Sequence, residues 1–177
     1  MDVASLLSGI GSLGLGTVLG TWLSARRTRL DARANVIPAV EKVERTRWFS
    51  TSTDSIDKVR AAVLELVAAA LRGGLPRKPV MLYAALAVAS WRISEKDPDH
   101  SLWDEWADVV TDARDLVRSL VWRDDVAGRD FQREADFLFH RAQAVTRRTV
   151  KVVWAESSDL RAYERTYKPA EPARSGS

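Results

Sequence analysis

The chain opens with VASLLSGIGSLGLGTVLGTWLSA, residues Val3–Ala25, a stretch without a single charged side chain. As a helix it would measure about 35 Å at 1.5 Å per residue, against a bilayer hydrocarbon core of about 30 Å. One acidic residue precedes it, and a cluster of four arginines follows: Arg26, Arg27, Arg29 and Arg33. Positive charge on the C-terminal flank favours a cytoplasmic C-terminus. The stretch therefore predicts a single transmembrane anchor, residues 1–25, with its N-terminus outside.

Three other interpretations of this stretch are weaker. A cleaved signal peptide carries its positive charge before the apolar run, whereas here the charge follows it. A soluble, buried helix remains open, because five glycines lower both the hydrophobicity and the helix propensity. Gly9–Gly14 matches the dinucleotide-binding pattern of glycines, but that pattern needs a preceding strand, and no strand-like run comes before it. We therefore treat that match as chance.

Small side chains recur at every fourth position of the predicted anchor, at Ser8, Ser12, Gly16, Gly20 and Ser24. Such a stripe lets two membrane helices approach closely, so it predicts self-association of the anchor. The alternative is that small residues are simply common in membrane helices. The four arginines are expected to fix the topology and to attract anionic lipid headgroups by about 1 kcal/mol each.

The composition restricts the chemistry. The chain has 177 residues, which fits one domain and the anchor. The absence of cysteine excludes disulfides and thiolate metal sites. With only two histidines in the chain, we do not expect a metal site built from histidines. A formal charge of +3 does not indicate nucleic-acid binding. No nucleotide-binding, hydrolase or metalloprotease motif is present, so we expect no cofactor and no enzymatic activity. Abundant arginine, alanine and valine are typical of a GC-rich bacterial genome.

The rest of the chain predicts an all-α fold, because apolar residues recur at helical spacing and no segment alternates like a strand. Helices are expected at about 38–49, 54–72, 79–91, 102–122, 130–154 and 158–167. The run 79–91 has no charge and is too short to span a bilayer, so it predicts a central, buried helix around Leu82, Leu86 and Ala89. A re-entrant membrane segment is the alternative.

These helices predict a cytoplasmic, antiparallel bundle of about five helices behind the anchor. We divide the chain into an anchor (1–25), a basic juxtamembrane helix and linker helix (26–53), the bundle domain (54–157), and a short helix with a disordered tail (158–177). The linker helix should have a polar surface formed by five residues: Glu41, Lys42, Glu44, Arg45 and Arg47.

Two groups of polar residues could carry chemistry. One is a stripe of carboxylates on a single helix, at Asp104, Asp108, Asp112 and Asp115. The 1.5 Å rise spreads it over more than about 15 Å, so it cannot converge on one ion. It predicts a solvated face, a set of arginine partners, or a surface for a protein partner. The other group is Asp136 and His140, one helical turn apart, which could be a base with its orienting partner or half of a metal site. An exposed contact along the helix is the more ordinary interpretation.

The leading hypothesis is a non-enzymatic interaction or scaffold protein, anchored in the bacterial inner membrane and self-associating through the anchor. Its expected partners are membrane lipid, a second copy and an unknown protein, whereas nucleic acid is not expected. One alternative is a membrane-acting effector or pore former with a cytoplasmic sensing bundle. Another is a soluble helical ligand-binding or enzymatic bundle that uses Asp136 and His140.

Overall fold

The protein is all-helical within the residues that the computed structural model describes, which are 24–49, 55–96, 103–123, 129–149 and 158–167. A helical stretch at 24–34 leads into six further helices: α2 (Val36–Phe49), α3 (Ser55–Arg72), α4 (Arg77–Lys96), α5 (Trp103–Trp122), α6 (Arg129–Thr149) and α8 (Ser158–Tyr167). No strand occurs in these ranges, which confirms the predicted all-α class.

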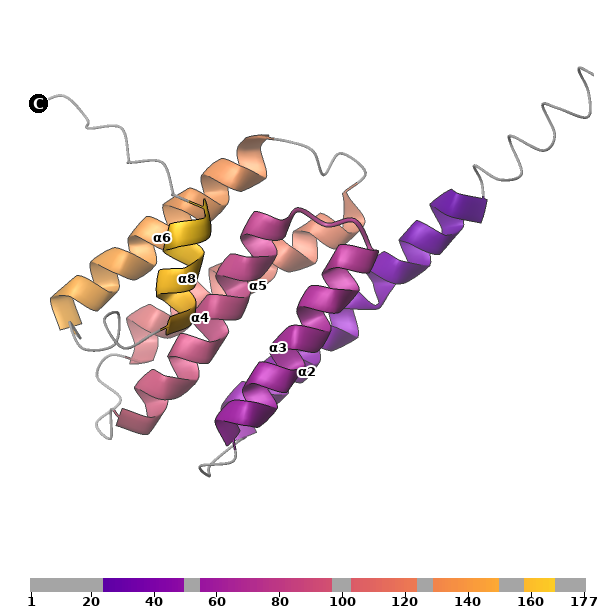
Figure 1. The fold of residues 1–177 in the computed structure, drawn as a ribbon. Helices are drawn as coiled ribbons and strands as arrows, with labels where there is room; N and C mark the ends of the chain where they lie inside the picture. Colours follow the sequence, from indigo (N-terminus) through magenta and orange to yellow (C-terminus); the bar gives the residue numbers. More distant parts are fainter. Residues whose placement is uncertain (1–23, 50–54, 97–102, 124–128, 150–157, 168–177) are drawn as a thin grey trace, which may run out of the picture.

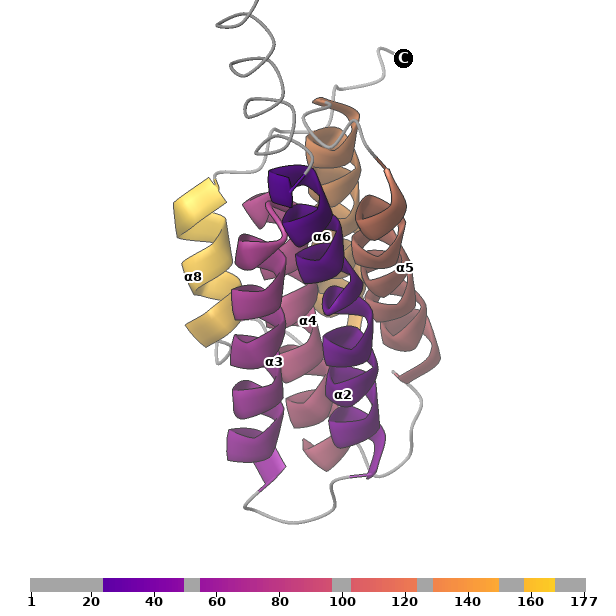
Figure 2. The same cartoon turned by 90° about the vertical axis from the view of Figure 1, so that its right-hand side faces the viewer.

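Helix α4 is the centre of the bundle. It packs against α2, α3, α5, α6 and α8, and Figures 1 and 2 show it enclosed by them. Every residue from Leu82 to Trp91 is buried. The sequence of this helix explains its position, because ten consecutive uncharged side chains can be buried on all sides without leaving an unpaired charge. The expectation that Leu82, Leu86 and Ala89 form the core is confirmed.

The core extends beyond the predicted bundle domain of residues 54–157. Helix α2 contributes Val36, Val40 and Val43, which are all fully buried, and α8 contributes Leu160 and Tyr163. Both helices therefore belong to the same packed unit as α3–α6. Helix α2 begins two residues before Pro38, which is compatible with helix there because the first turn needs no internal N–H partner.

The turn from α3 to α4 is sharp. Gly74 has a φ of 68°, a left-handed conformation that glycine adopts without strain. The Leu75 amide donates to the Ala70 carbonyl at 2.9 Å, and the Gly74 amide donates to the Leu71 carbonyl at 3.1 Å. This is a Schellman motif, in which the last carbonyls of α3 are satisfied by the turn itself.

The polar surface predicted for α2 is wrong at two of its five positions. Glu44 is 8% exposed and Arg47 is 3% exposed, because α3, α4 and α5 all pack against this helix. Arg47 follows Val36, Val40 and Val43 at the same helical spacing and so lies on the buried side.

Among the described residues, no helix is both long and apolar enough to cross a membrane. Most of the predicted anchor, including Ser8, Ser12, Gly16 and Gly20, lies outside those residues. Ser24, Arg26, Arg27 and Arg29 are described, and all four are exposed on the helical stretch 24–34.

Candidate interaction surface

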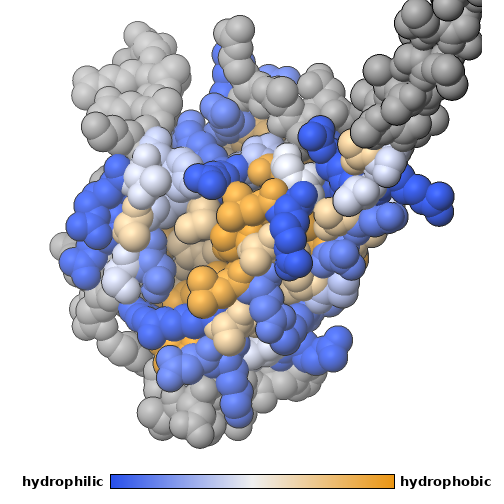
Figure 3. All heavy atoms as spheres, turned by 45° about the vertical axis from the view of Figure 1, so that its right-hand side comes forward, coloured by the Kyte–Doolittle hydropathy of each residue, from blue (hydrophilic) through white to orange (hydrophobic). Residues whose placement is uncertain are grey.

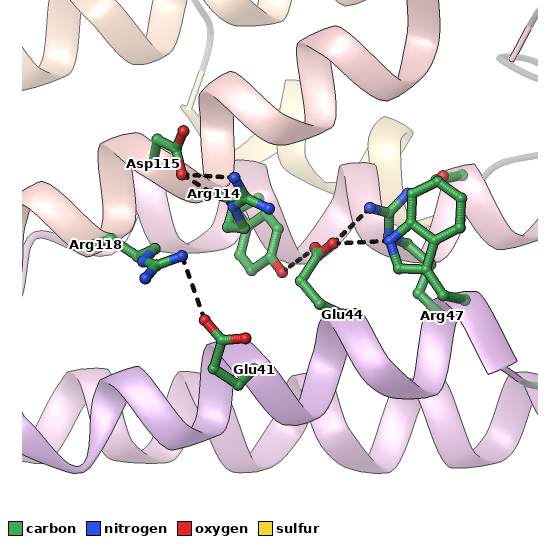
Figure 4. A network of polar contacts seen from close by, with 9 residues as sticks. Glu41, Glu44, Arg47, Arg114, Asp115 and Arg118 are labelled. Atoms are coloured by element: carbon green, nitrogen blue, oxygen red, sulfur yellow. Dashed lines mark hydrogen bonds and ion pairs between the residues drawn. The ribbon is translucent and has the colours of Figure 1, made fainter. Parts of the chain in front are cut away.

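A buried polar network joins α2 to α4 (Figure 4). The Glu44 carboxylate accepts hydrogen bonds from Arg47 Nη2 and from the Tyr83 hydroxyl, both at 2.6 Å, and from Trp48 Nε1 at 3.2 Å. Arg47 Nη1 also donates to the Ser90 hydroxyl at 2.9 Å. One carboxylate thus satisfies three donors, two of which come from its own helix.

Burial and the adjacent Glu44 carboxylate raise the pKa of Tyr83 far above its ordinary value. Tyr83 is therefore a neutral hydrogen-bond donor throughout the physiological range. The Glu44–Arg47 charges neutralise each other inside the bundle. A second ion pair, at 3.3 Å between Arg118 of α5 and Glu41 of α2, is about half exposed (Figure 4). Arg47 Nε is buried without a hydrogen-bond partner among the described residues, but the Glu44 carboxylate and its three donors are paired with one another, and this indicates a structural role.

Arg33 holds the helical stretch 24–34 against the bundle. Its Nε donates to the Gly73 carbonyl and its Nη1 to the Arg123 carbonyl, each at 3.0 Å. These carbonyls lie just beyond the C-terminal ends of α3 and α5, where the helix dipole favours a cation. A Cβ on Gly73 would lie 3.2 Å from Arg33 Cα, so glycine permits this close approach.

This burial distinguishes Arg33 from the other predicted headgroup-binding arginines. Arg33 is 7% exposed, whereas Arg26, Arg27 and Arg29 are exposed. Its bonds to two backbone carbonyls do not support the predicted lipid contact at this position. The other three positions remain a prediction.

Asp136 and His140 do not form the isolated pair that their spacing suggested. Asp136 Oδ1 lies 2.6 Å from Lys78 Nζ of α4, and both side chains are about 15% exposed. The pair thus joins α6 to the start of α4. The His140 ring meets the Phe139 ring edge-on, with the centroids 5.6 Å apart. The described residues contain no group of three or more His, Asp or Glu side chains placed to hold a metal ion.

The predicted aspartate stripe is divided between several roles. Asp112 of α5 forms an ion pair with Arg141 of α6, and Asp115 pairs with Arg114 of its own helix at 2.9 Å. Asp108 is exposed, and the side chain of Asp104 lies outside the described part of the chain. The ion pair of Asp112 with Arg141 matches one of the three expectations for the stripe, that its aspartates pair with arginines of another helix. A docking role for the stripe remains a prediction.

An apolar surface lies between α3 and α8, over α4. Two hollows of about 300 and 350 Å³ share Val67 of α3, Met81 of α4 and Tyr167 of α8, so they form one continuous groove. Figure 3 shows apolar side chains gathered in a hollowed patch on this side of the molecule, surrounded by polar ones. We call this feature the α3–α8 groove.

The rim of the groove exposes two large apolar side chains of α3. Leu64 is 69% exposed and Leu71 is 44% exposed, and each lines one of the two hollows. On the opposite side, α8 contributes Tyr163, whose hydroxyl is buried without a hydrogen-bond partner among the described residues. Continuous exposed apolar surface of this kind is typical of a site that binds another molecule.

Comparison with protein-family models, with curated proteins and with solved structures finds no match. The α3–α8 groove and the polar contacts between the helices are therefore the features that bear on function.

The groove was not predicted from the sequence, because it depends on how α8 packs beside α3. A signal was present in α3, which carries more alanine, valine and leucine than one helical face can bury. The buried network was not predicted either; its signal was the i, i+3 pair Glu44 and Arg47 beside the apolar stripe of α2.

Proposed function

We propose that this protein is a membrane-anchored helical interaction or scaffold module that self-associates and presents its bundle in the bacterial cytoplasm. The observation that carries the proposal is the α3–α8 groove with its exposed rim, Leu64 and Leu71. A groove with one wall from α3, the other from α8 and an apolar floor suits an amphipathic helix as its ligand.

The polar groups of the bundle support a binding role over catalysis. Glu44 accepts hydrogen bonds from Arg47 Nη2 and the Tyr83 hydroxyl, Arg47 Nε is left without a partner among the described residues, and Asp136 is paired with Lys78. A catalytic residue would instead need a proton-transfer partner that a substrate can reach. These contacts join α2 to α4 through Tyr83 and Ser90, and α6 to α4 through Lys78.

The anchoring part of the proposal rests on the uncharged stretch Val3–Ala25 and on the arginines after it. Arg26, Arg27 and Arg29 are exposed on the helix that continues from that stretch, where they can meet lipid headgroups. Arg33 then fixes this helix to the ends of α3 and α5.

The test of anchoring is flotation with liposomes of the full chain and of a chain that lacks residues 1–25. The full chain should float with the vesicles, and the shortened chain should stay at the bottom of the gradient. Equal behaviour of the two chains would refute the anchor.

The test of the interaction surface is the mass of the full chain in mild detergent, measured by light scattering. Leu64→Asp combined with Leu71→Asp should lower the assembled mass. Phe137→Asp is the matched control, because Phe137 is 65% exposed on α6 and does not line the groove. An unchanged mass in the leucine variant would refute the role of the rim.

A further inference from the structure

A second apolar stripe runs along the outer side of α3. It consists of Ala61, Leu64, Ala68 and Leu71, at spacings of three, four and three residues, and all four are exposed. The buried side of the same helix is formed by other residues: Val59, Ala62, Leu66, Ala69 and Ala70. None of the four belongs to the hydrophobic core of the described helices. We call it the α3 seam.

The spacing of the seam is that of a coiled-coil heptad. Alanine occupies the a positions and leucine the d positions, and leucine at d suits a two-stranded assembly. Small alanines also let two helix backbones approach closely. The seam spans ten helical steps, or about 15 Å.

We propose that the α3 seam binds the α3 seam of a second copy of this chain, in a parallel, two-fold symmetric pair. The inference rests on the proposed self-association and names its cytoplasmic contact. Leu64 and Leu71 of each copy would then lie against the same residues of the other, covering the rim of the α3–α8 groove.

The charges beside the seam select the parallel direction. Arg60 is at a g position on the groove side, and Glu65 is at an e position on the α2 side. In a parallel pair each g residue lies near the e residue five positions on in the other helix, so Arg60 meets the partner's Glu65 twice. In an antiparallel pair Glu65 would face the partner's Glu65, and Lys58 would face the partner's Arg72. Like charges would then line that interface.

The ion pairs that these residues make within one copy do not oppose this arrangement. Arg60 lies 3.8 Å from Asp57, and Glu65 lies 2.6 Å from Lys42, with all four side chains at least 42% exposed. Exposed pairs of this kind are weak and exchange readily with other partners.

The position of the N-terminal helix also selects the parallel direction. Arg33 ties the stretch 24–34 to the C-terminal end of α3. Only a parallel pair places both of these stretches at the same end of the dimer, as two anchors in one membrane require. Two anchored copies also have a high local concentration, so a seam of three helical turns is long enough to pair.

Cysteine cross-linking tests the pairing and its direction, because the chain has no native cysteine. Ala61→Cys and Leu71→Cys are introduced singly into the full chain, which is reconstituted in phosphatidylcholine–phosphatidylglycerol vesicles and oxidised. We expect disulfide dimers at both positions, at least severalfold more than in the control Arg161→Cys. Arg161 is exposed on α8 and does not line the α3–α8 groove.

Mixing the two cysteine variants reports the direction. A parallel pair gives almost no disulfide between Cys at 61 and Cys at 71, since ten residues separate them along the axis. A predominant mixed disulfide would show the antiparallel pair and would overturn the proposal.

Charge exchange tests the contact between Arg60 and the partner's Glu65. Arg60→Glu and Glu65→Arg, each in the Ala61→Cys background, should lower the cross-linking rate severalfold. The double variant Arg60→Glu, Glu65→Arg should restore most of it. Equal rates in all four chains would overturn the charge argument.

Flotation of the same samples separates this inference from the anchor. Vesicle-bound protein that cross-links no more than the Arg161→Cys control refutes the seam and leaves the anchor standing. Seam-specific cross-links in protein that does not float uphold the seam and refute the anchor. Protein that neither floats nor cross-links above the control refutes both.

Discussion

Replacing Glu44 with leucine should be among the most destabilising single changes in this bundle. The change removes the acceptor of three hydrogen bonds and leaves the Arg47 guanidinium, whose side chain is 1% exposed, without its carboxylate. Breaking a buried ion pair at one partner costs about 3–5 kcal/mol. That loss is a large part of the roughly 5–15 kcal/mol by which a domain is stable.

Urea denaturation of the full chain, followed by circular dichroism, measures this loss. With a slope of about 2 kcal/mol per molar urea, the unfolding midpoint should fall by about 2 M. Glu41→Leu is the matched control, because Glu41 is on the same helix and its ion pair with Arg118 is about half exposed. It should change the free energy of unfolding by less than about 1 kcal/mol.

The double variant Glu44→Leu, Arg47→Met distinguishes an unpaired charge from lost packing. It removes both charges and keeps similar apolar volume, so it should be more stable than Glu44→Leu alone. The reasoning is refuted if Glu44→Leu costs less than about 1 kcal/mol, or if the second change adds a further loss of similar size.

Three further predictions concern tyrosine and the α3–α4 turn. Tyr83→Phe should cost about 1.5–3 kcal/mol of stability, because it removes a hydrogen bond to a charged group. Tyr163→Phe should be neutral or stabilising, because the Tyr163 hydroxyl is buried without a partner among the described residues. Thermal melts of the two variants and the unchanged chain measure both effects. Burial raises the pKa of both tyrosines, so stability should hold below about pH 10, where unfolded tyrosine ionises, and fall as the pH rises further. A Tyr83→Phe, Tyr163→Phe chain should show a shallower fall of the melting temperature with pH, and an unchanged slope would contradict the assignment. Gly74→Ala should cost about 1–2 kcal/mol by urea denaturation, because alanine is strained at a φ of 68°.

Much of the fold could be predicted from the sequence, because apolar periodicity and helix-ending residues are local signals. The uncharged run of α4 predicted its central position, and the helix expected at 54–72 ends at Arg72, as α3 does. Five apolar residues that recur at helical spacing along α5 are all buried: Trp106, Val109, Ala113, Leu116 and Leu120. These predictions needed no knowledge of which helices become neighbours.

The site depends on that knowledge. In the sequence, Arg33 cannot be told apart from the other arginines of its basic cluster. Only the fold brings the Gly73 and Arg123 carbonyls to it, from positions 40 and 90 residues away in the chain. Likewise, Lys78 and Asp136 become a pair only when α6 packs beside α4. The α3–α8 groove exists because α8 packs on α4 and leaves part of α3 uncovered.

The position of Arg33 connects the two proposed contacts between copies. Its guanidinium bonds the last turn before α2 to the C-terminal ends of α3 and α5, and a Cβ added to Gly73 would lie only 3.3 Å from the Arg33 backbone nitrogen. The stretch 24–34 therefore cannot rotate without breaking one buried and one partly buried hydrogen bond. Association of two anchors would fix how the two α3 helices face each other, and pairing of the α3 seams would in turn fix the anchors. Arg33→Met should weaken this connection, lowering seam cross-linking while the protein still floats with vesicles.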